Sequence, residues 1–448
     1  MIRRAVAAAF AATLAACAYN PVTPPPAFEA VLDRELAAIV SDASCPLASL
    51  SVIAVRDGEV VYERGFGRRV IDAAGHGDKP ADARTLYRIA SISKLVTTLG
   101  VMKLVEDGRL SLDQDIGSYL GYPVRNPHFP GAAITMRMLL THTSSLRDDA
   151  GYFSVNGALR DFLVPGGSRY GDGAMWSREH APGAWFSYAN LPWGVAATVM
   201  EKVTGKRFDH LMRELVLDPM GLTGGYNPAD LSRTSIVNLA TLYRKATAGD
   251  EQVWNPDGPW VAQTDDYSST APVSRARDDY IAGTNGTLFG PQGGLRASIG
   301  DLGRIMRMLI GGGEIDGRRV LAKASVDAML ARQWTRAPGN GEADYGSHRG
   351  RFNAWGLGNQ HFLDVSGPDF GDRLVEDARY PASGHLGDAY GLMGTLAFDR
   401  TSRSGLAFLA GGTGCDPEKQ RGKYSAGARF EERIVTALHR RAIRGITD

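Results

Sequence analysis

Residues 382–410 read ASGHLGDAYGLMGTLAFDRTSRSGLAFLA and contain three strand-like segments in succession, Ala382–Tyr390, Leu392–Phe398 and Leu406–Ala410. The turn-rich stretch Asp399–Gly405 separates the last two segments. Consecutive strands joined by short turns pair as antiparallel neighbours. The C-terminal part of the chain therefore predicts an antiparallel sheet.

The N-terminal part offers strands of the same kind. Leu50–Val55 is an apolar alternating run that turns at Asp57-Gly58 and returns through Val60–Phe66. An Asp-Gly pair between two such runs predicts a β-hairpin. We therefore expect the two terminal parts of the chain to build one sheet together.

Helical patterns complete this arrangement. Amphipathic periods predict helices over Ala27–Ser41 and Arg429–Arg444, one at each end of the chain. The middle of the chain has helical periods separated by long loops rich in Gly, Pro and Asp, at Met136–Leu140, Leu191–Val203 and Phe208–Leu217. The expected fold class is α/β (α+β): an α/β lobe from about 27–120 and 291–448, enclosing a mostly helical lobe from about 121–290.

Composition excludes several classes of protein. The chain has 448 residues, 44% hydrophobic, with 50 Lys+Arg against 49 Asp+Glu and a net charge of +1. This balance gives no electrostatic case for nucleic-acid binding. The 54 Gly and 22 Pro follow no period, and no apolar run is long enough to span a bilayer as a helix.

Residues 1–17 have the pattern of an export signal. Arg3 and Arg4 precede a short apolar stretch, and the run from Leu14 to Cys17 resembles a bacterial lipobox, in which the cysteine is acylated. A plain secretory signal is the alternative. Residues 18–26, rich in proline, then form an extended tether. Because Ala18 is not the aspartate of inner-membrane lipoproteins, we expect an envelope protein anchored by lipid, at the outer membrane and facing the periplasm.

The other two of the 3 cysteines lie beside predicted strands. Cys45 precedes the first strand of the hairpin, and Cys415 follows the segment Leu406–Ala410. If those strands are antiparallel neighbours, the start of one meets the end of the other, and a disulfide becomes feasible in an exported protein. The alternative is two unpaired small apolar residues.

Ser91-Ile92-Ser93-Lys94 opens a helical run and is the strongest local signal for chemistry. At spacing i, i+3 the Ser91 hydroxyl and the Lys94 amine share a helix face. A desolvated lysine can take the proton of a serine nucleophile, and the helix N-terminus directs free N–H groups at an oxyanion. The motif alone is weak, because chance matches are frequent.

Further candidates follow in order along the chain. Tyr188-Ala189-Asn190 places a phenol and an amide on one loop, and His385-Leu386-Gly387 brings an imidazole and a glycine that permits close backbone approach. Aromatic residues of the 240–290 insertion either line an acyl pocket or anchor the loop: Trp254, Trp260, Tyr267 and Tyr280.

These motifs together resemble those of the serine β-lactamase and penicillin-binding-protein superfamily, in the branch that holds class C β-lactamases, D-stereospecific peptidases and related esterases. The resemblance covers about 27–444. It implies a five-stranded antiparallel sheet flanked by helices, a helical lobe, and an active site in the cleft between them. No cofactor and no metal is implied.

The resemblance also implies residue roles. Ser91 matches the acylated nucleophile, Lys94 its proton acceptor, and Tyr188 the residue that passes a proton to the leaving group. Asn190 matches the residue that orients the substrate amide, and His385 stands where many relatives have the lysine of Lys-Thr-Gly.

The oxyanion hole implied by the resemblance is the backbone N–H of Ser91 with that of Asp388, the residue after Gly387. Leu386 replaces the hydroxyl residue that relatives active on β-lactams direct at the substrate carboxylate. The Asp388 side chain is expected to point away from the site. His142, in a Thr-His-Thr-Ser motif, is expected to be a hydrogen-bonded packing residue.

Other hydrolase classes lack their motifs in this chain. No Gly-x-Ser-x-Gly elbow occurs, and the 9 histidines form no His-Glu-x-x-His. We therefore predict a serine hydrolase acting through an acyl-enzyme on a small-molecule or peptide substrate: a β-lactam, a D-amino-acid peptide or a small ester. The alternative is a non-catalytic binding or scaffold lipoprotein that keeps the fold. The oligomeric state is left open.

Overall fold

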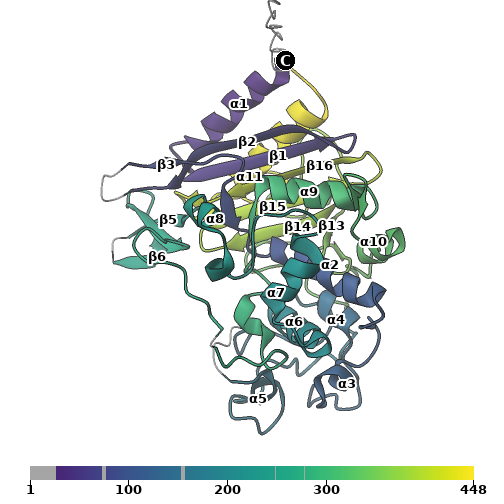
Figure 1. The fold of residues 1–448 in the computed structure, drawn as a ribbon. Coiled ribbons are helices and arrows are strands. Elements are labelled where there is room, and N and C mark those ends of the chain that lie inside the picture. The colour runs from purple at the N-terminus through teal and green to yellow at the C-terminus, as the bar shows by residue number, and fades with distance from the viewer. Residues whose placement is uncertain (1–26, 73–76, 153–156, 248, 277, 448) are drawn as a thin grey trace, which may run out of the picture.

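The computed structural model describes residues 27–72, 77–152, 157–247, 249–276 and 278–447 (Figure 1). Cys17 and the proline-rich tether lie outside these residues. Within the described part of the chain, no helix is both long and apolar enough to cross a membrane. The first helix and the C-terminal end lie together at one end of the molecule (Figure 1).

A central sheet has the strand order β11-β12-β13-β14-β15-β16-β1-β2-β3. Its five long strands, neighbours in that order, are β14 (Ala382–Ala389), β15 (Leu392–Asp399), β16 (Ser404–Ala410), β1 (Ser49–Arg56) and β2 (Glu59–Val70). Short strands extend both edges: β11 (Trp334–Thr335), β12 (Ala354–Trp355), β13 (Gln360–Phe362) and β3 (Lys79–Pro80). All neighbouring pairs are antiparallel, so both terminal parts of the chain share one sheet as predicted.

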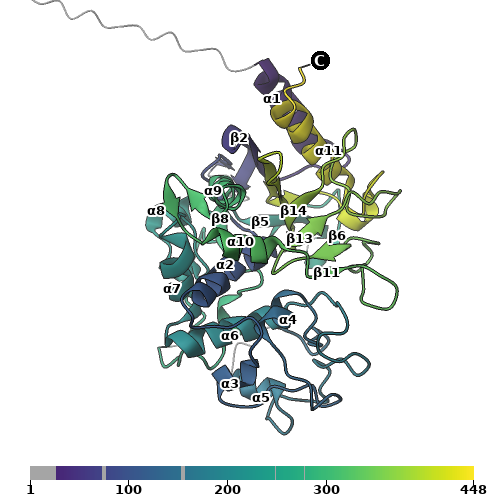
Figure 2. The same ribbon diagram turned by 90° about the vertical axis from the view of Figure 1, so that its right-hand side faces the viewer.

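The helices α1 (Ala27–Val40) and α11 (Arg429–Leu438) cover one face of this sheet, as Figure 2 shows. α11 continues as a π-helical turn over His439–Ile443. Apolar side chains of both helices pack on Val52, Leu406 and Phe408, which lie on the same sheet face. Burial of this face accounts for the 3.6-residue periods by which both helices were predicted.

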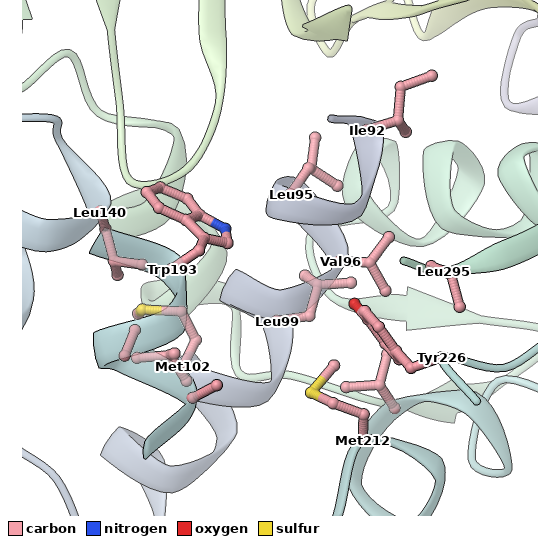
Figure 3. Close-up of a cluster of buried hydrophobic side chains, with 14 of the residues drawn as sticks. Ile92, Leu95, Val96, Leu99, Met102, Leu140, Trp193, Met212, Tyr226 and Leu295 are labelled. Atoms are coloured by element: carbon pink, nitrogen blue, oxygen red, sulfur yellow. The ribbon is translucent and has the colours of Figure 1, made fainter. Parts of the chain in front are cut away.

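The opposite face of the sheet carries α9 (Ile299–Ile310) and the larger core, which centres on α2 (Ile92–Glu106). Every residue from Ile92 to Met102 is buried, so α2 is enclosed on all sides rather than amphipathic. Figure 3 shows its apolar side chains between Trp193 on one flank and Tyr226 and Leu295 on the other. A helix buried in this way holds its first turn rigidly, and that turn carries the candidate nucleophile.

Helices predominate in the middle of the chain, as predicted. They are α3 (Ile116–Leu120), α4 (Met136–Leu140), α5 (Leu159–Leu163), α6 (Leu191–Thr204), α7 (Phe208–Met212) with a π-helical turn (Arg213–Leu217), and α8 (Arg233–Val237). Figure 2 shows α3, α4, α5 and α6 on the side of α2 away from the sheet.

One part of the middle region differs from the prediction. Residues 242–264 form strands rather than helix or loop, namely β5 (Leu242–Thr247), β6 (Asp250–Trp254) and β7 (Trp260–Thr264). β5 pairs in parallel with β17 (Gly412–Thr413), far along the chain. Because this pairing is long-range, no local pattern could reveal it.

The remaining strands and helix are short. They are β4 (Leu86–Arg88) paired with β8 (Arg296–Ser298), β9 (Glu314–Ile315) paired with β10 (Arg318–Arg319), and α10 (Lys323–Leu330). The 3-10 turns cover Pro228–Asp230, Gly286–Phe289 and Pro417–Lys419. The β4–β8 ribbon leads directly into α2 from one strand and into α9 from the other.

The disulfide between Cys45 and Cys415 is present, with Cα atoms 4.9 Å apart. The antiparallel strand pairing considered from the sequence explains this disulfide. β1 and β16 are antiparallel, with Leu50 opposite Ala410, so the start of one strand lies beside the end of the other. The bridge spans 370 residues and therefore joins the two halves of the split lobe.

Candidate active site

Ser91 lies in the sharp turn between β4 and α2. The preceding residue, Ala90, has a φ of 48°, a conformation that is strained for a residue with a Cβ. Ser91 occupies the N-cap position of α2, yet its hydroxyl makes no capping hydrogen bond. The hydroxyl is therefore available for chemistry at the positive end of a buried helix.

Lys94 lies one turn into α2 and is fully buried. Its Nζ donates to Ser91 Oγ at 2.9 Å, to Asn190 Oδ1 at 2.7 Å and to the Gln292 carbonyl at 3.2 Å. Burial lowers the pKa of Lys94 to about 7, although the charge of Asp148 opposes this shift. A large fraction of the amine is therefore neutral near pH 7 and can accept the Ser91 proton.

Tyr188 faces the same pair. Its hydroxyl hydrogen-bonds Ser91, and Lys94 Nζ lies 4.9 Å from its ring centroid. The ring stacks on Phe352 at 4.9 Å. Burial raises the pKa of Tyr188 well above its usual value, so the phenol keeps its proton at neutral pH. Tyr188 can therefore donate and relay a proton, while Lys94 is the base.

His142 positions Tyr188 from both sides. The Ser187 N–H donates to the His142 carbonyl at 2.9 Å, and the Ala189 N–H donates to His142 Nδ1 at 3.1 Å. Burial lowers the pKa of His142 well below its usual value, so the ring is neutral. His142 is thus a hydrogen-bonded packing residue, as predicted, and it fixes the backbone on both sides of Tyr188.

Asn190, at the start of α6, is held by Asp148. The Asp148 carboxylate accepts from the Asn190 N–H at 2.8 Å, from Asn190 Nδ2 at 2.9 Å and from the Leu191 N–H at 2.9 Å. Asp148 therefore caps α6 and orients the Asn190 amide so that its oxygen faces Lys94. The sequence analysis missed Asp148, because no local pattern marks it and its partners are distant in the chain.

His385 lies on β14 and faces the same side as Ser91 and Lys94. Its Nδ1–H donates to the Leu386 carbonyl at 2.7 Å, and Nε2 has no partner among the described residues. Burial, with a smaller effect of Lys94, lowers the pKa of His385 to about 3. The ring is therefore neutral, and its Nε2 is an acceptor that is buried without a partner among the described residues.

Gly387 brings β14 against the turn that carries Ser91. A Cβ added at Gly387 would lie 2.8 Å from the Ile89 carbonyl oxygen and 3.4 Å from Ile92 Cδ1, so only glycine fits without displacement. β13 pairs only with Ala382–Gly384, which leaves the cleft-side edge of β14 without a described partner from His385 onward. Backbone groups of this free edge lie beside Ser91.

Side chains alternate along β14. Leu386 packs into the apolar cluster beneath α11, on the sheet face opposite the site. Asp388 has the same parity, and its carboxylate faces the charges of Arg351 and Arg244. The Asp388 side chain therefore points away from the cleft, as expected, while its backbone remains next to Gly387.

Three motifs follow one another along the chain and converge in space: Ser91–Lys94, Tyr188–Asn190 and His385–Gly387. This arrangement has a counterpart among known proteins. The model of the family described as Beta-lactamase matches residues 32–428. The chain belongs to the beta-lactamase family.

Relatives of this beta-lactamase family member share its sequence and fold. Protein Rv1367c of Mycobacterium tuberculosis is 29% identical over 333 residues, which cover 68% of this chain and 73% of that protein. The octameric penicillin-binding protein homologue from Pyrococcus abyssi superposes with a TM-score of 0.59 at 22% identity, covering 87% of this chain and 74% of that one. The D-amino acid amidase from Ochrobactrum anthropi SV3 gives a TM-score of 0.58 at 20% identity, covering 85% of this chain and 92% of that one.

The aromatic residues of the 240–290 insertion are anchors rather than site residues in this family member. Trp254 packs under the Arg244 guanidinium at 4.9 Å, and the Tyr280 hydroxyl donates to Glu201 at 2.5 Å. The aromatic residues around Tyr188 come instead from Phe186 and from the β11–β13 region: Trp334, Phe352 and Trp355. Apart from Phe186, these residues lie far from Tyr188 in sequence, so only the tertiary structure could identify them.

Among the described residues, one group of potential metal ligands is clustered: Asp209, His210 and Asp230. The Arg207 guanidinium already lies within this group, 2.7 Å from Asp209 Oδ2, 2.7 Å from His210 Nε2 and 3.0 Å from Asp230 Oδ2. The group is therefore an ion-pair network around the Arg207 guanidinium. This network lies outside the Ser91 site.

Proposed function

We propose that the protein is a serine hydrolase that cleaves an amide or ester bond through an acyl-enzyme formed on Ser91. The observation that carries this proposal is the contact between Ser91 Oγ and Lys94 Nζ at 2.9 Å, made by a lysine that is fully buried. Burial makes that amine a base at neutral pH, and an adjacent base is what activates a serine hydroxyl.

The proposed reaction has two stages. Ser91 Oγ attacks the substrate carbonyl carbon, and its proton passes to neutral Lys94. The Ser91 N–H, which donates to no described acceptor, and the neighbouring Asp388 N–H stabilise the oxyanion. The Tyr188 hydroxyl then transfers a proton to the leaving nitrogen or oxygen and is reprotonated from Lys94, and the acyl-enzyme remains. Water, deprotonated by the same pair, attacks the ester and releases the acid.

The substrate is an amide or ester of moderate size, in the class that includes D-amino-acid peptides, small esters and β-lactams. Leu386 packs away from the cleft and offers no hydroxyl to a β-lactam carboxylate. The solved amidase with the same fold was crystallised with D-phenylalanine, which favours D-amino-acid amides as the first compounds to assay.

Active-site labelling tests this function. The purified protein is treated with a fluorophosphonate and with a fluorescent penicillin, and Ser91→Ala serves as the matched control. The proposal is supported if one probe labels the wild type but not Ser91→Ala, and if the wild type hydrolyses nitrophenyl esters or D-alanyl-D-alanine peptides. Labelling by neither probe, with no hydrolysis, would favour a non-catalytic binding or scaffold protein.

We also propose that the protein acts in the cell envelope, at the outer membrane facing the periplasm, anchored through a lipid on Cys17. The lipobox-like sequence before Cys17 supports this, as does a disulfide that is stable only in an oxidising compartment. Metabolic labelling with palmitate should mark the wild-type protein and not Cys17→Ser. An unlabelled wild-type protein found in the soluble periplasmic fraction would instead indicate a plain secretory signal.

A further inference from the structure

A buried arginine without a carboxylate partner lies close to the nucleophile. Arg88 is the last residue of β4, three positions before Ser91, and only 4% of it is exposed. Its Nε donates to the Gly293 carbonyl at 3.1 Å. Neither Nη atom donates to any described residue, and neither is sealed from solvent. Buried charges in proteins are ordinarily paired, so an unpaired one calls for an external partner.

The neighbouring strand shows what a paired arginine looks like here. Arg296 lies directly opposite Arg88 in the β4–β8 ribbon. The Asp265 carboxylate binds Arg296 in a two-point ion pair, at 2.6 Å and 3.0 Å. Like charges placed opposite each other destabilise a ribbon. The Asp265 carboxylate is paired with Arg296, so Arg88 is left without a carboxylate partner among the described residues.

Tyr390 connects this cation to the molecular surface. The Arg88 guanidinium carbon lies 4.4 Å from the centroid of the Tyr390 ring, and Tyr390 is 41% exposed. Tyr390 follows Asp388 by two residues, in the turn that comes directly after β14. Tyr152 interacts electrostatically with both Tyr390 and Arg88. The cation therefore lies beside the turn that follows β14, two residues after Asp388 in the chain.

Arg88 stays charged in this setting. Burial, and then the charge of Arg296, lower the pKa of Arg88 to about 10, which leaves the guanidinium protonated at neutral pH. A guanidinium with two free Nη groups matches the two oxygens of a carboxylate.

We propose that Arg88, framed by Tyr390, is a substrate-binding subsite for an anionic group, such as a carboxylate, carried by the amide or ester that Ser91 attacks. This inference rests on the proposed hydrolase function. The subsite makes the protein selective for substrates with a negative charge a short distance from the scissile bond.

Two substrate pairs that differ only in charge test the subsite. The 4-nitrophenyl monoester of glutaric acid, against its methyl ester, carries the charge on the acyl side. N-acetyl-D-alanyl-D-alanine, against its C-terminal amide, carries it on the leaving-group side. For the pair whose anion reaches Arg88, we expect wild-type kcat/KM to favour the charged member about tenfold or more.

Substitutions at the subsite should remove this preference. Arg88→Met should bring the charged-to-neutral ratio of kcat/KM close to one. Arg64→Met is the matched control, because Arg64 also lies over a tyrosine ring, at 5.5 Å, but is paired with Glu29 on the α1 face of the sheet. An unchanged ratio in a folded Arg88→Met protein would overturn the subsite.

Tyr390 provides a second test that does not disturb the core. Tyr390→Glu places an internal carboxylate beside the guanidinium and should abolish the preference, whereas the neutral Tyr390→Gln should retain most of it. Equal ratios in these two variants would overturn the inference. A wild-type protein that hydrolyses these substrates without charge preference would overturn the subsite alone. Absence of hydrolysis and of Ser91 labelling would overturn the proposed function, and the subsite with it.

Discussion

At the scale of single residues, Lys94 has the environment that most directly sets the chemistry. It is a fully buried amine whose hydrogen-bond partners are a hydroxyl, an amide oxygen and a carbonyl, with no carboxylate among them. A protonated lysine in such a place loses its hydration, and the charge of Asp148 offsets only part of that loss. The site therefore favours the neutral amine, which is the form needed to deprotonate Ser91.

The first prediction concerns pH. Because Lys94 has a pKa of about 7 and must be neutral to act, kcat/KM should rise about tenfold per unit below pH 7 and level off above it. His385, with a pKa of about 3, and Tyr188, with a raised pKa, do not titrate in that range. The measurement is a pH–rate profile on a nitrophenyl ester between pH 5 and 9.

Lys94→Met should remove the rise and lower the rate by about 10²–10⁴-fold. Lys103→Met is the matched control, because Lys103 lies on the same helix but pairs with Glu106 at 3.4 Å near the surface. A wild-type rate that does not change between pH 5 and 9 would contradict Lys94 as the base.

The second prediction concerns Asp148. Asp148→Asn keeps the shape of the side chain but loses the negative charge on which three N–H donors converge. We expect a loss of about 1–3 kcal/mol in stability and a fall in kcat, since the Asn190 amide is no longer held toward Lys94. Thermal denaturation and steady-state kinetics measure the two effects.

Asp149→Asn is the control for that experiment. Asp149 is the adjacent residue, and its carboxylate accepts from Arg147 at 2.8 Å at the surface. If Asp148→Asn and Asp149→Asn behave alike in both kcat and stability, Asp148 has no positioning role.

At the scale of elements, the site depends on how closely β14 approaches the N-terminus of α2. Local patterns predicted both elements, because apolar residues recur along α2 and β14 precedes a short turn. The helix α9 carries a local signal of its own. Its start is fixed locally by a capping box, in which Ser298 and Asp301 each accept from the other's backbone N–H. The strands β5–β7 were missed, although β5 pairs with β6 and β7 nearby in the chain as well as with β17 from the other end.

The third prediction tests the approach of β14 to α2. Gly387→Ala inserts a methyl group 2.8 Å from the Ile89 carbonyl and must push the strand outward. Displacing one oxyanion donor should lower kcat about 10²–10³-fold, with a loss of about 1–3 kcal/mol in stability.

Gly131→Ala is the control, because a Cβ at Gly131 meets nothing within 4 Å and its backbone needs no positive φ. Kinetics and urea denaturation compare the variants. Full activity of Gly387→Ala would show that the separation of β14 and α2 does not limit catalysis.

At the scale of the whole molecule, the α/β lobe is assembled from two chain ends separated by the helical lobe. The disulfide closes this lobe across 370 residues. A covalent link across so long a loop restricts the unfolded chain strongly, which is the main way in which disulfides stabilise proteins.

The fourth prediction follows from that link. The double variant Cys45→Ser, Cys415→Ser should lose about 2–4 kcal/mol in free energy of unfolding, as should the wild type after reduction. Urea denaturation with and without reductant measures the difference. Identical midpoints for the oxidised wild type and the double variant would show that the bridge adds no stability.

The sequence by itself determined the strands and helices with strong local periodicity, and the residues with reactive groups in their motifs. Ser91, Lys94, Tyr188, Asn190 and His385 were all identifiable, because motif spacing is a local property. The antiparallel pairing that made the disulfide feasible was also within reach, since both cysteines flank predicted strands.

The tertiary structure decided what those residues can do. Three properties of the site depend on burial and on partners far away in the chain. They are the neutrality of Lys94, the anchoring of Asn190 by Asp148 and the unpaired charge of Arg88. Periodicity along a sequence encodes which face of an element is apolar, but it carries no information about which distant charge is left without a partner. For that reason the sequence indicates the kind of reaction, and only the folded site indicates the base, its support and the substrate charge that we propose.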